Sequence, residues 1–280
     1  MRHPTGTDPP PARHRTAVGL DDARLRVTEI GDEDLSAVVI AHGAGSSARF
    51  IVDAFAGPVL ACGRRLVTFD LRGHGGSDPA RDPGNHHLDV HAADLRVVVA
   101  SVQGSIDVIG GVSLGAHAAV RAVASQGLTC AVTLACLPAW TGRAVAGVGP
   151  HAVVATEVRE VGIPAMIARL EAATDLPAWL REVLVRDYRS HDPESLVAAL
   201  LSLDGGVAPG VDEVASLPVP LAVVGWPDDP GHPLTVARHW AGLAPVGTLR
   251  TLALRDLEGG VDHLGRLAMI AVDEVLGEEI

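Results

Sequence analysis

The residues with the clearest chemical potential lie in the stretch Gly111 to Gly115, which reads Gly-Val-Ser-Leu-Gly. An apolar run, Ile106–Gly110, precedes this stretch, and a helical pattern follows it. A serine on a sharp turn between a strand and a helix forms a nucleophile elbow, in which flanking glycines let neighbouring backbone come close. The N-terminus of the helix directs N–H groups towards negative charge. We therefore predict that Ser113 is a nucleophile.

A second glycine-bearing turn follows the expected strand Ala37–Ala41 and reads His-Gly-Ala-Gly. Glycines leave backbone N–H groups accessible, and an acyl-transfer site needs two such donors for its oxyanion. We predict that the N–H groups of Ala44 and Leu114 form this oxyanion hole. The adjacent His42 is expected to be a structural hydrogen-bonding residue.

Two acidic residues follow the expected strand Leu221–Gly225, at the sheet edge where ligands of α/β proteins bind. Asp229 is favoured as the acid of a catalytic triad, because the spacing Asp-x-x-x-Pro then places Pro233 at the start of the next helix. Asp228 stays open as the alternative acid. His232 lies so close to the acid in sequence that we expect it to pack or cap rather than act as the base.

The base expected from the sequence is His263, in Gly-Gly-Val-Asp-His-Leu between the last strand and the last helix. A histidine on a glycine-bearing loop suits the chain order serine, acid, histidine. His86, His87 and His91 include a pair spaced i, i+4, but no convincing third ligand accompanies them. We interpret these three as a surface or interface cluster and predict no metal site.

Composition narrows the class of protein further. The 280-residue chain has a net charge of −12, which argues against binding to nucleic acid or to an anionic membrane surface. It contains no lysine, so a pyridoxal-phosphate Schiff base and a Walker-type phosphate loop are both excluded. We predict no cofactor. The three cysteines show no metal or disulfide spacing. With no signal-peptide pattern and no long apolar run, we expect a soluble cytoplasmic protein.

Short apolar runs alternate with helical patterns, which predicts an α/β fold with a mostly parallel sheet flanked by helices. The expected strands are Leu25–Ile30, Ala37–Ala41, Arg65–Phe69, Ile106–Gly110, Ala131–Ala135, Leu221–Gly225 and Thr248–Leu254. The expected helices are His91–Ser101, Gly115–Ser125, Pro233–Ala244 and Leu264–Leu276.

One stretch lacks a convincing strand and shows three helical patterns instead, Pro164–Ala173, Pro177–Tyr188 and Pro193–Leu203. Each begins at a proline, which favours the first turn of a helix. We therefore divide the chain into a core of residues 18–137 and 211–280 and a helical cap of residues 138–210. Residues 1–17, rich in Pro, Arg and His, are expected to be flexible.

The segments HGAGSS, DLRGHGGSD, GVSLGAH, WPDDPGHP and GGVDHL together resemble, in type and order, the α/β-hydrolase superfamily. The resemblance covers roughly Arg24 to Val275. It implies an α/β-hydrolase fold, a helical lid at residues 138–210, and a triad of Ser113, Asp229 and His263. The sequence departs from the family at Asp262, where a glycine is often found.

These features predict an esterase-type serine hydrolase of small molecules, with a preference for an enol-lactone or a small carboxylic ester. The serine at the elbow argues against epoxide hydrolases and haloalkane dehalogenases, which resemble one another in having aspartate there. A ligand-binding protein, a cofactor-free lyase or cyclase, and a C–C bond hydrolase stay open as alternatives. Candidate residues lining the substrate site are Trp140, Trp179, Tyr188 and Trp226. The sequence leaves the oligomeric state open.

Overall fold

The computed structural model describes residues 11–82, 84–143, 150–204 and 206–277. They form an eight-stranded sheet in the order β1-β2-β4-β3-β5-β6-β7-β8. The strands are β1 (Arg13–Val18), β2 (Arg24–Ile30), β3 (Ala37–Ala41), β4 (Arg65–Phe69), β5 (Ile106–Val112), β6 (Val132–Cys136), β7 (Leu221–Gly225) and β8 (Gly247–Thr251). The pairs β1–β2 and β2–β4 are antiparallel, and the other neighbouring pairs are parallel. The predicted fold class is confirmed.

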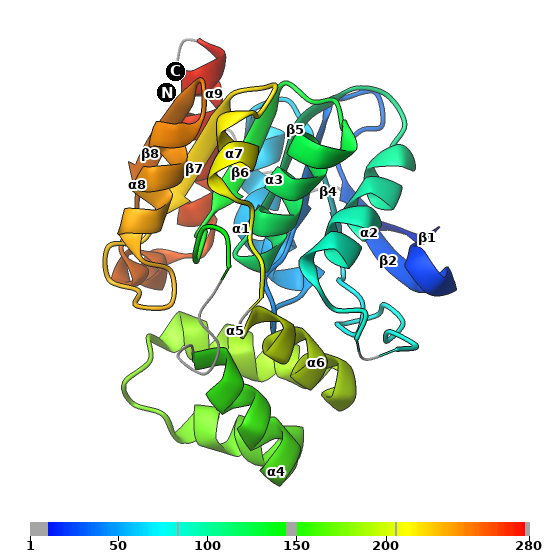
Figure 1. Ribbon diagram of the computed structural model, residues 1–280, viewed down its shortest axis with the longest axis vertical. Helices are drawn as coiled ribbons and strands as arrows, with labels where there is room; N and C mark the ends of the chain where they lie inside the picture. The colour runs from blue at the N-terminus through cyan, green and yellow to red at the C-terminus, as the bar shows by residue number, and fades with distance from the viewer. Residues whose placement is uncertain (1–10, 83, 144–149, 205, 278–280) are drawn as a thin grey trace, which may run out of the picture.

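Helices cover both faces of this sheet (Figure 1). The α-helices are α1 (Ala48–Ala61), α2 (Leu88–Ala100), α3 (Leu114–Gln126), α4 (Pro150–Ala172), α5 (Ala178–Tyr188), α6 (Pro193–Leu203), α7 (Val211–Ala215), α8 (Leu234–Leu243) and α9 (Asp262–Leu276). Two short 3-10 helices are η1 (Leu20–Asp22) and η2 (Leu254–Gly259). Helices α2, α3, α7 and α8 bury their apolar residues on one face, and α1 and α9 do so on the other.

The central strands are apolar without alternation because both of their faces are covered. All five residues of β3 and all five of β7 are buried. A strand buried on both sides has no solvent face that would require polar residues. Continuous apolar runs in the sequence therefore predicted every strand except β1. The predicted ends differ from the observed ones by at most three residues.

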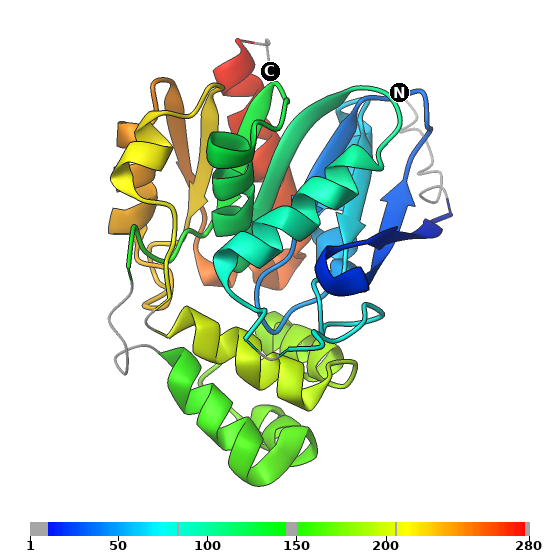
Figure 2. The same ribbon diagram turned by 45° about the vertical axis from the view of Figure 1, so that its right-hand side comes forward.

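Helices α4, α5 and α6 form a separate group beyond the sheet, at the end where the parallel strands reach their carboxyl ends (Figures 1 and 2). Their apolar residues pack on one another in a third cluster that includes Ala155, Leu196 and Leu200. Helix α4 is interrupted at Gly162, with φ 77° and ψ 164°, just before Pro164. Asp192 caps α6 by accepting the Ser195 N–H at 2.8 Å. The description of residues 138–210 as a cap over the site stays a hypothesis.

The expectation that residues 1–17 are flexible is wrong where the structure describes them. Residues 13–18 form β1, an edge strand that pairs antiparallel with β2. Arg15 forms an ion pair with Glu29 at 2.7 Å, and Arg13 donates to the carbonyl of Gly31 at 2.9 Å. These cross-strand contacts order a segment whose composition suggested a loose end. Residues 1–10 lie outside the described part of the chain.

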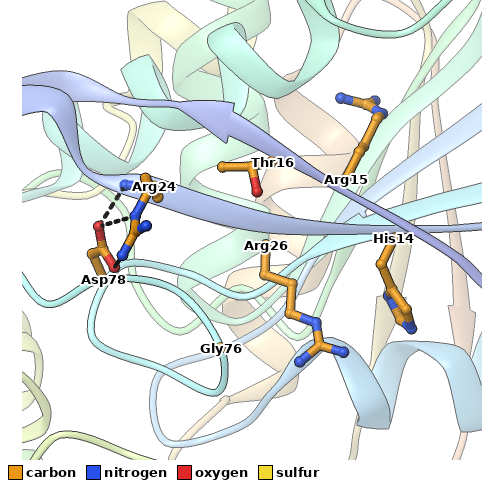
Figure 3. A pocket seen from close by; sticks show the side chains of 7 residues that line it. All are labelled: His14, Arg15, Thr16, Arg24, Arg26, Gly76 and Asp78. Atoms are coloured by element: carbon orange, nitrogen blue, oxygen red, sulfur yellow. Dashed lines mark hydrogen bonds and ion pairs between the residues drawn. The ribbon is translucent and has the colours of Figure 1, made fainter.

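The outer face of the β1–β2 pair borders a shallow hollow of about 390 Å³, seen in Figure 3. Arg24 crosses to Asp78, with Nε at 3.0 Å and Nη2 at 3.2 Å from the two carboxylate oxygens. His14 and Arg26 lie on the same side of the strands (Figure 3). The Arg24–Asp78 contact ties this edge of the sheet to the loop that follows β4.

That loop, Asp70 to Asp78, is held by the side chains of Asp70 and Arg72. Asp70 accepts the N–H of Gly76 at 2.9 Å as well as the N–H of Ala48 at the start of α1. Arg72 reaches α2, where it binds both oxygens of Asp94 at 2.7 Å, with both side chains fully buried. The loop is therefore fixed to two helices.

The interpretation of His86, His87 and His91 as a surface or interface cluster is wrong for two of the three. His86 and His91 are buried against the core, and only His87 is exposed. In α2, His91 shares a buried side of the helix with Leu88 and Leu95, whereas His87 is the N-cap residue. Within the described residues, no group of three or more His, Cys, Asp or Glu side chains is arranged to hold a metal ion.

We predict an acid-sensitive fold, because burial lowers the pKa of His42, His74 and His117 to about 3. These imidazoles are neutral in the folded chain but protonate near pH 6.5 once unfolded. Unfolding then takes up protons, so the free energy of unfolding falls as the pH drops from about 6.5 towards 3. Urea unfolding at pH values between about 7.5 and 4.5 measures this slope.

His117→Gln supplies the control for this prediction. Replacing one buried histidine should make the slope shallower by about 1.4 kcal/mol per pH unit. A free energy of unfolding that is constant over this pH range would contradict the expectation.

Candidate active site

Ser113 lies on the turn between β5 and α3 in a strained backbone conformation, with φ 54° and ψ −116°. A positive φ is uncommon for a residue with a side chain, and it persists only where the surroundings enforce it. The N–H of Ser113 donates to the carbonyl of Cys136 at 2.8 Å, which fixes the turn to β6. The structure therefore has the elbow geometry that the sequence predicts.

The glycines on either side of Ser113 are required by close backbone packing. A Cβ on Gly115 would lie 2.2 Å from the carbonyl oxygen of Ala41, and a Cβ on Gly111 would lie 2.2 Å from the backbone of Gly115. No real Cβ fits at such distances. The prediction that these glycines permit a close approach is confirmed, and the approach brings α3 against the end of β3.

The loop that follows β3 lies directly against Ser113. A Cβ on Gly43 would be 3.1 Å from the Cβ of Ser113. The loop folds into a tight turn closed by the Ser46 N–H, which donates to the Gly43 carbonyl at 3.1 Å. Gly45, at the third position of this turn, has φ 74°, which favours glycine.

Two backbone donors flank the serine in this arrangement. The N–H of Ala44 has no hydrogen-bond acceptor among the described residues. Leu114 occupies the first position of α3, where N–H groups have no partner within the helix. Whether these two groups bind an oxyanion, as the sequence predicts, stays a proposal.

Ser113 takes part in a continuous chain of side-chain hydrogen bonds. Its Oγ lies 2.9 Å from Nε2 of His232, and Nδ1 of His232 lies 2.6 Å from Oδ2 of Asp229. The carboxylate can only accept, so Nδ1 carries the proton and Nε2 is left to accept the hydroxyl proton of Ser113. The arrangement can therefore remove a proton from the serine.

The second oxygen of Asp229 is also occupied, accepting the N–H of Gly231 at 2.8 Å. Burial raises the pKa of Asp229, but its hydrogen bonds and the charge of His232 outweigh this effect, and the net pKa is lowered. The lowered pKa favours the ionised carboxylate, the form that orients an imidazole.

The histidine that the structure places beside Ser113 is thus His232, and not His263 as the sequence led us to expect. Which of the two acts as the base stays a proposal. Asp229, Pro230 and Gly231 form a turn in which the His232 N–H donates to the Asp229 carbonyl at 3.2 Å. This turn folds the imidazole back over the carboxylate three residues earlier. The short spacing that argued against His232 is what allows the contact, and an aspartate followed by Pro-Gly was the available signal.

His263 and Asp228 are held elsewhere. Nδ1 of His263 lies 2.7 Å from the backbone oxygen of Asp256, and within the described residues it makes no hydrogen bond to Ser113. Both oxygens of Asp228 accept the N–H of Leu254, at 3.0 and 3.1 Å. Asp228 therefore joins the loop after β7 to the one after β8, and it is Asp229, not Asp228, that binds His232.

The four aromatic residues proposed to line the site lie in three different surroundings. Trp179 and Trp226 pack edge to face within the apolar cluster, and the Trp179 indole N–H donates to the Leu254 carbonyl at 2.9 Å. Tyr188 lies over Gly45, whose Cβ would be 3.0 Å from the phenol ring. Trp140 stacks edge-on against His117, with ring centres 4.9 Å apart. Their role in binding substrate stays a prediction.

The comparisons with known proteins concern the family and the fold of the chain. A model of the alpha/beta hydrolase family matches residues 38–275. The chain therefore belongs to the alpha/beta hydrolase family, as the motifs predicted, and this membership supports an enzyme of the hydrolase type. By sequence, no curated protein matches the chain.

Several solved structures share the fold at low sequence identity. An esterase from Exiguobacterium antarcticum has a TM-score of 0.75 and 14% identity, over 93% of this chain and 98% of that one. The enol-lactonase from Burkholderia xenovorans LB400 has a TM-score of 0.73 and 17% identity, over 94% and 100%. A bromoperoxidase from Bacillus anthracis has a TM-score of 0.73 and 13% identity, over 95% and 100%.

These likenesses extend over nearly the whole chain and establish its architecture. They do not by themselves define the reaction, since one fold carries many activities. None of the described helices combines the length and apolar character that crossing a bilayer requires.

We predict that Gly115→Ala prevents correct folding at the elbow, because the added methyl would lie 2.2 Å from the Ala41 carbonyl oxygen. The expected result is a melting temperature lowered by several degrees or no folded protein. Gly57→Ala in α1 is the matched control. No atom lies within 4 Å of its added Cβ, so this change should stabilise the helix by about 0.5–1 kcal/mol. Equal melting temperatures for the two variants would contradict the packing described.

Proposed function

We propose that the protein is a serine hydrolase that cleaves a carboxylic ester or lactone of a small molecule through an acyl-enzyme. The observation that carries this proposal is the chain from Ser113 Oγ through His232 to Asp229, with distances of 2.9 and 2.6 Å. The nucleophile is hydrogen-bonded to the base, and the base in turn to the orienting acid.

In this mechanism His232 Nε2 takes the proton of Ser113 as Oγ attacks the carbonyl carbon. Asp229 holds the imidazole in the required tautomer and stabilises its charged form. The N–H groups of Ala44 and Leu114 bind the oxyanion of the tetrahedral intermediate. His232 then protonates the leaving alcohol, and in the second half it activates the water that releases the acid.

The proposed substrate class is supported by the fold rather than by a bound molecule. An esterase and an enol-lactonase share the whole architecture at low identity. Helices α4 to α6 lie over the carboxyl end of the sheet, where the elbow is, as a cap on a small acyl substrate would (Figure 2). The proposed division is a core of residues 18–137 and 211–280 with a cap of residues 138–210.

The first prediction here separates the two candidate bases. His232→Gln should lower kcat for p-nitrophenyl butyrate by about 10³-fold or more, because Ser113 loses its proton acceptor. His263→Gln should leave kcat within about threefold, because His263 bonds the backbone at Asp256. Labelling of Ser113 by a fluorophosphonate should follow the same pattern, and Ser113→Ala should abolish both activity and labelling.

The reverse pattern would show that the base is His263 after all. A Ser113→Ala variant that retains ester turnover would exclude the serine mechanism. Wild-type protein that is folded but neither labelled nor active would exclude the proposed hydrolase.

A second prediction concerns the acid. Asp229→Asn should lower kcat by about 10⁴-fold, because an amide can stabilise the wrong tautomer of His232. Asp228→Asn is the matched control one residue away. It disturbs only the contact with Leu254 and should leave kcat near the wild-type value. Steady-state kinetics of both variants measure these effects. A larger loss of kcat in Asp228→Asn than in Asp229→Asn would show that Asp228 is the acid.

A further inference from the structure

Two buried histidines join the oxyanion loop to the loop after β4 by reciprocal hydrogen bonds. His42, at the end of β3, accepts the N–H of Leu71 at Nε2 over 2.9 Å. His74, in the loop after β4, accepts the N–H of Gly45 at Nε2 over 3.1 Å. Each ring thus takes a backbone donor from the other's loop, and the ring centres are 5.2 Å apart. We call His42 and His74 the reciprocal histidine pair.

The partners of the reciprocal histidine pair leave each ring a single protonation state. Nδ1 of His42 lies 2.7 Å from the Gly43 carbonyl, and Nδ1 of His74 lies 2.9 Å from the Arg72 carbonyl. A carbonyl only accepts and an amide only donates, so each ring is neutral with its proton on Nδ1. Burial, which lowers the pKa of both rings to about 3, keeps them neutral at ordinary pH.

The bond from Gly45 to His74 fixes the peptide group that follows Ala44. Together with the closing bond from Ser46 to Gly43, it determines how the four-residue turn is oriented against Ser113. The direction of the free Ala44 N–H depends on that orientation. A donor must aim at the developing oxyanion to within a fraction of an ångström to stabilise it.

A third imidazole connects this arrangement to the helices beyond the sheet. His191, after α5, packs edge-on against His74 with ring centres 4.6 Å apart, and its Nδ1 lies 3.4 Å from the Gly75 N–H. The Asp192 N–H donates to the Gly73 carbonyl at 3.2 Å, and Tyr188 covers Gly45. The corner between α5 and α6 therefore holds His74 in place from the far side.

We propose that His42 and His74 are positioning residues for catalysis: as neutral acceptors they fix the oxyanion loop so that the Ala44 N–H points at the reacting carbonyl. This inference rests on the proposed function, in which Ala44 supplies one oxyanion donor. According to this inference, catalysis also requires two histidines that contact neither the substrate nor Ser113.

The test compares three replacements of His74. Leucine fills much of the ring's space without an acceptor. Asparagine places a polar group near Nδ1 only, and glutamine places an amide oxygen near the position of Nε2. His74→Leu and His74→Asn should lower kcat for p-nitrophenyl butyrate by about 10²-fold with KM changed less than about threefold. The same two variants should bind a boronic acid transition-state analogue more weakly by a similar factor. His74→Gln should retain most of the wild-type kcat and most of the wild-type affinity for the boronic acid.

Thr68→Val is the control for stability alone. It removes a buried hydrogen bond to the Ile40 carbonyl, 2.8 Å long, without touching the oxyanion loop, so kcat should not change. If His74→Leu does not fold, the comparison of asparagine with glutamine still decides the question. Equal kcat in those two variants, or a loss in Thr68→Val as large as in His74→Asn, would overturn the inference.

The outcomes separate this inference from the proposed function. Wild-type protein that neither reacts with a fluorophosphonate nor hydrolyses the ester would remove the proposed function and this inference with it. Wild-type protein that does both, with full kcat and full boronate affinity in His74→Leu and His74→Asn, would remove the positioning role alone.

Discussion

The close approach of α3 to the end of β3 is the constraint on which the site depends. Gly115 lies so near the Ala41 carbonyl that no side chain fits between them. This contact brings the start of α3, with its unpaired N–H groups, beside the loop of Gly43 and Ala44. It also forces Ser113 into a strained turn whose cost is met by packing in the surrounding sheet. The serine and the Ala44 N–H are neighbours because two glycines lack side chains.

Much of the fold could be predicted from the sequence, because burial on both faces leaves a simple signal. Strands such as β3 and β7 are continuous apolar runs, and Asp192 with Pro193 marks the start of α6. Strand β1 was missed for the opposite reason. It is an edge strand with exposed polar residues, held by cross-strand ion pairs that composition does not reveal.

The site shows where local reasoning from residue types reaches its limit. Ser113 was identifiable because the sharp turn around it requires glycines at the neighbouring positions 111 and 115, and this requirement is visible in the sequence. The partner histidine depends on how one turn folds, and sequence distance was a poor guide to it: His232 reaches Ser113 across 119 positions while bonding Asp229 three positions away. Of the buried imidazoles, His42 was expected to form structural hydrogen bonds and does so. The role of His74 was hidden, since a neutral histidine accepting a backbone N–H leaves no pattern of spacing. His263 was expected as the base because chain order and a glycine-bearing loop favoured it, and neither reveals the turn that places His232 beside Ser113.

Because Asp229 and His232 belong to one short loop, they form a single mechanical unit. If this loop moves, the imidazole and its carboxylate move together, and their mutual geometry is preserved by the turn they share. The distance that changes is the one from Nε2 to Ser113. In the proposed mechanism, proton transfer therefore depends on this one distance rather than on the separate placement of two segments. In the proposed mechanism, the segment from β8 to α9 therefore holds no group that reacts with the serine.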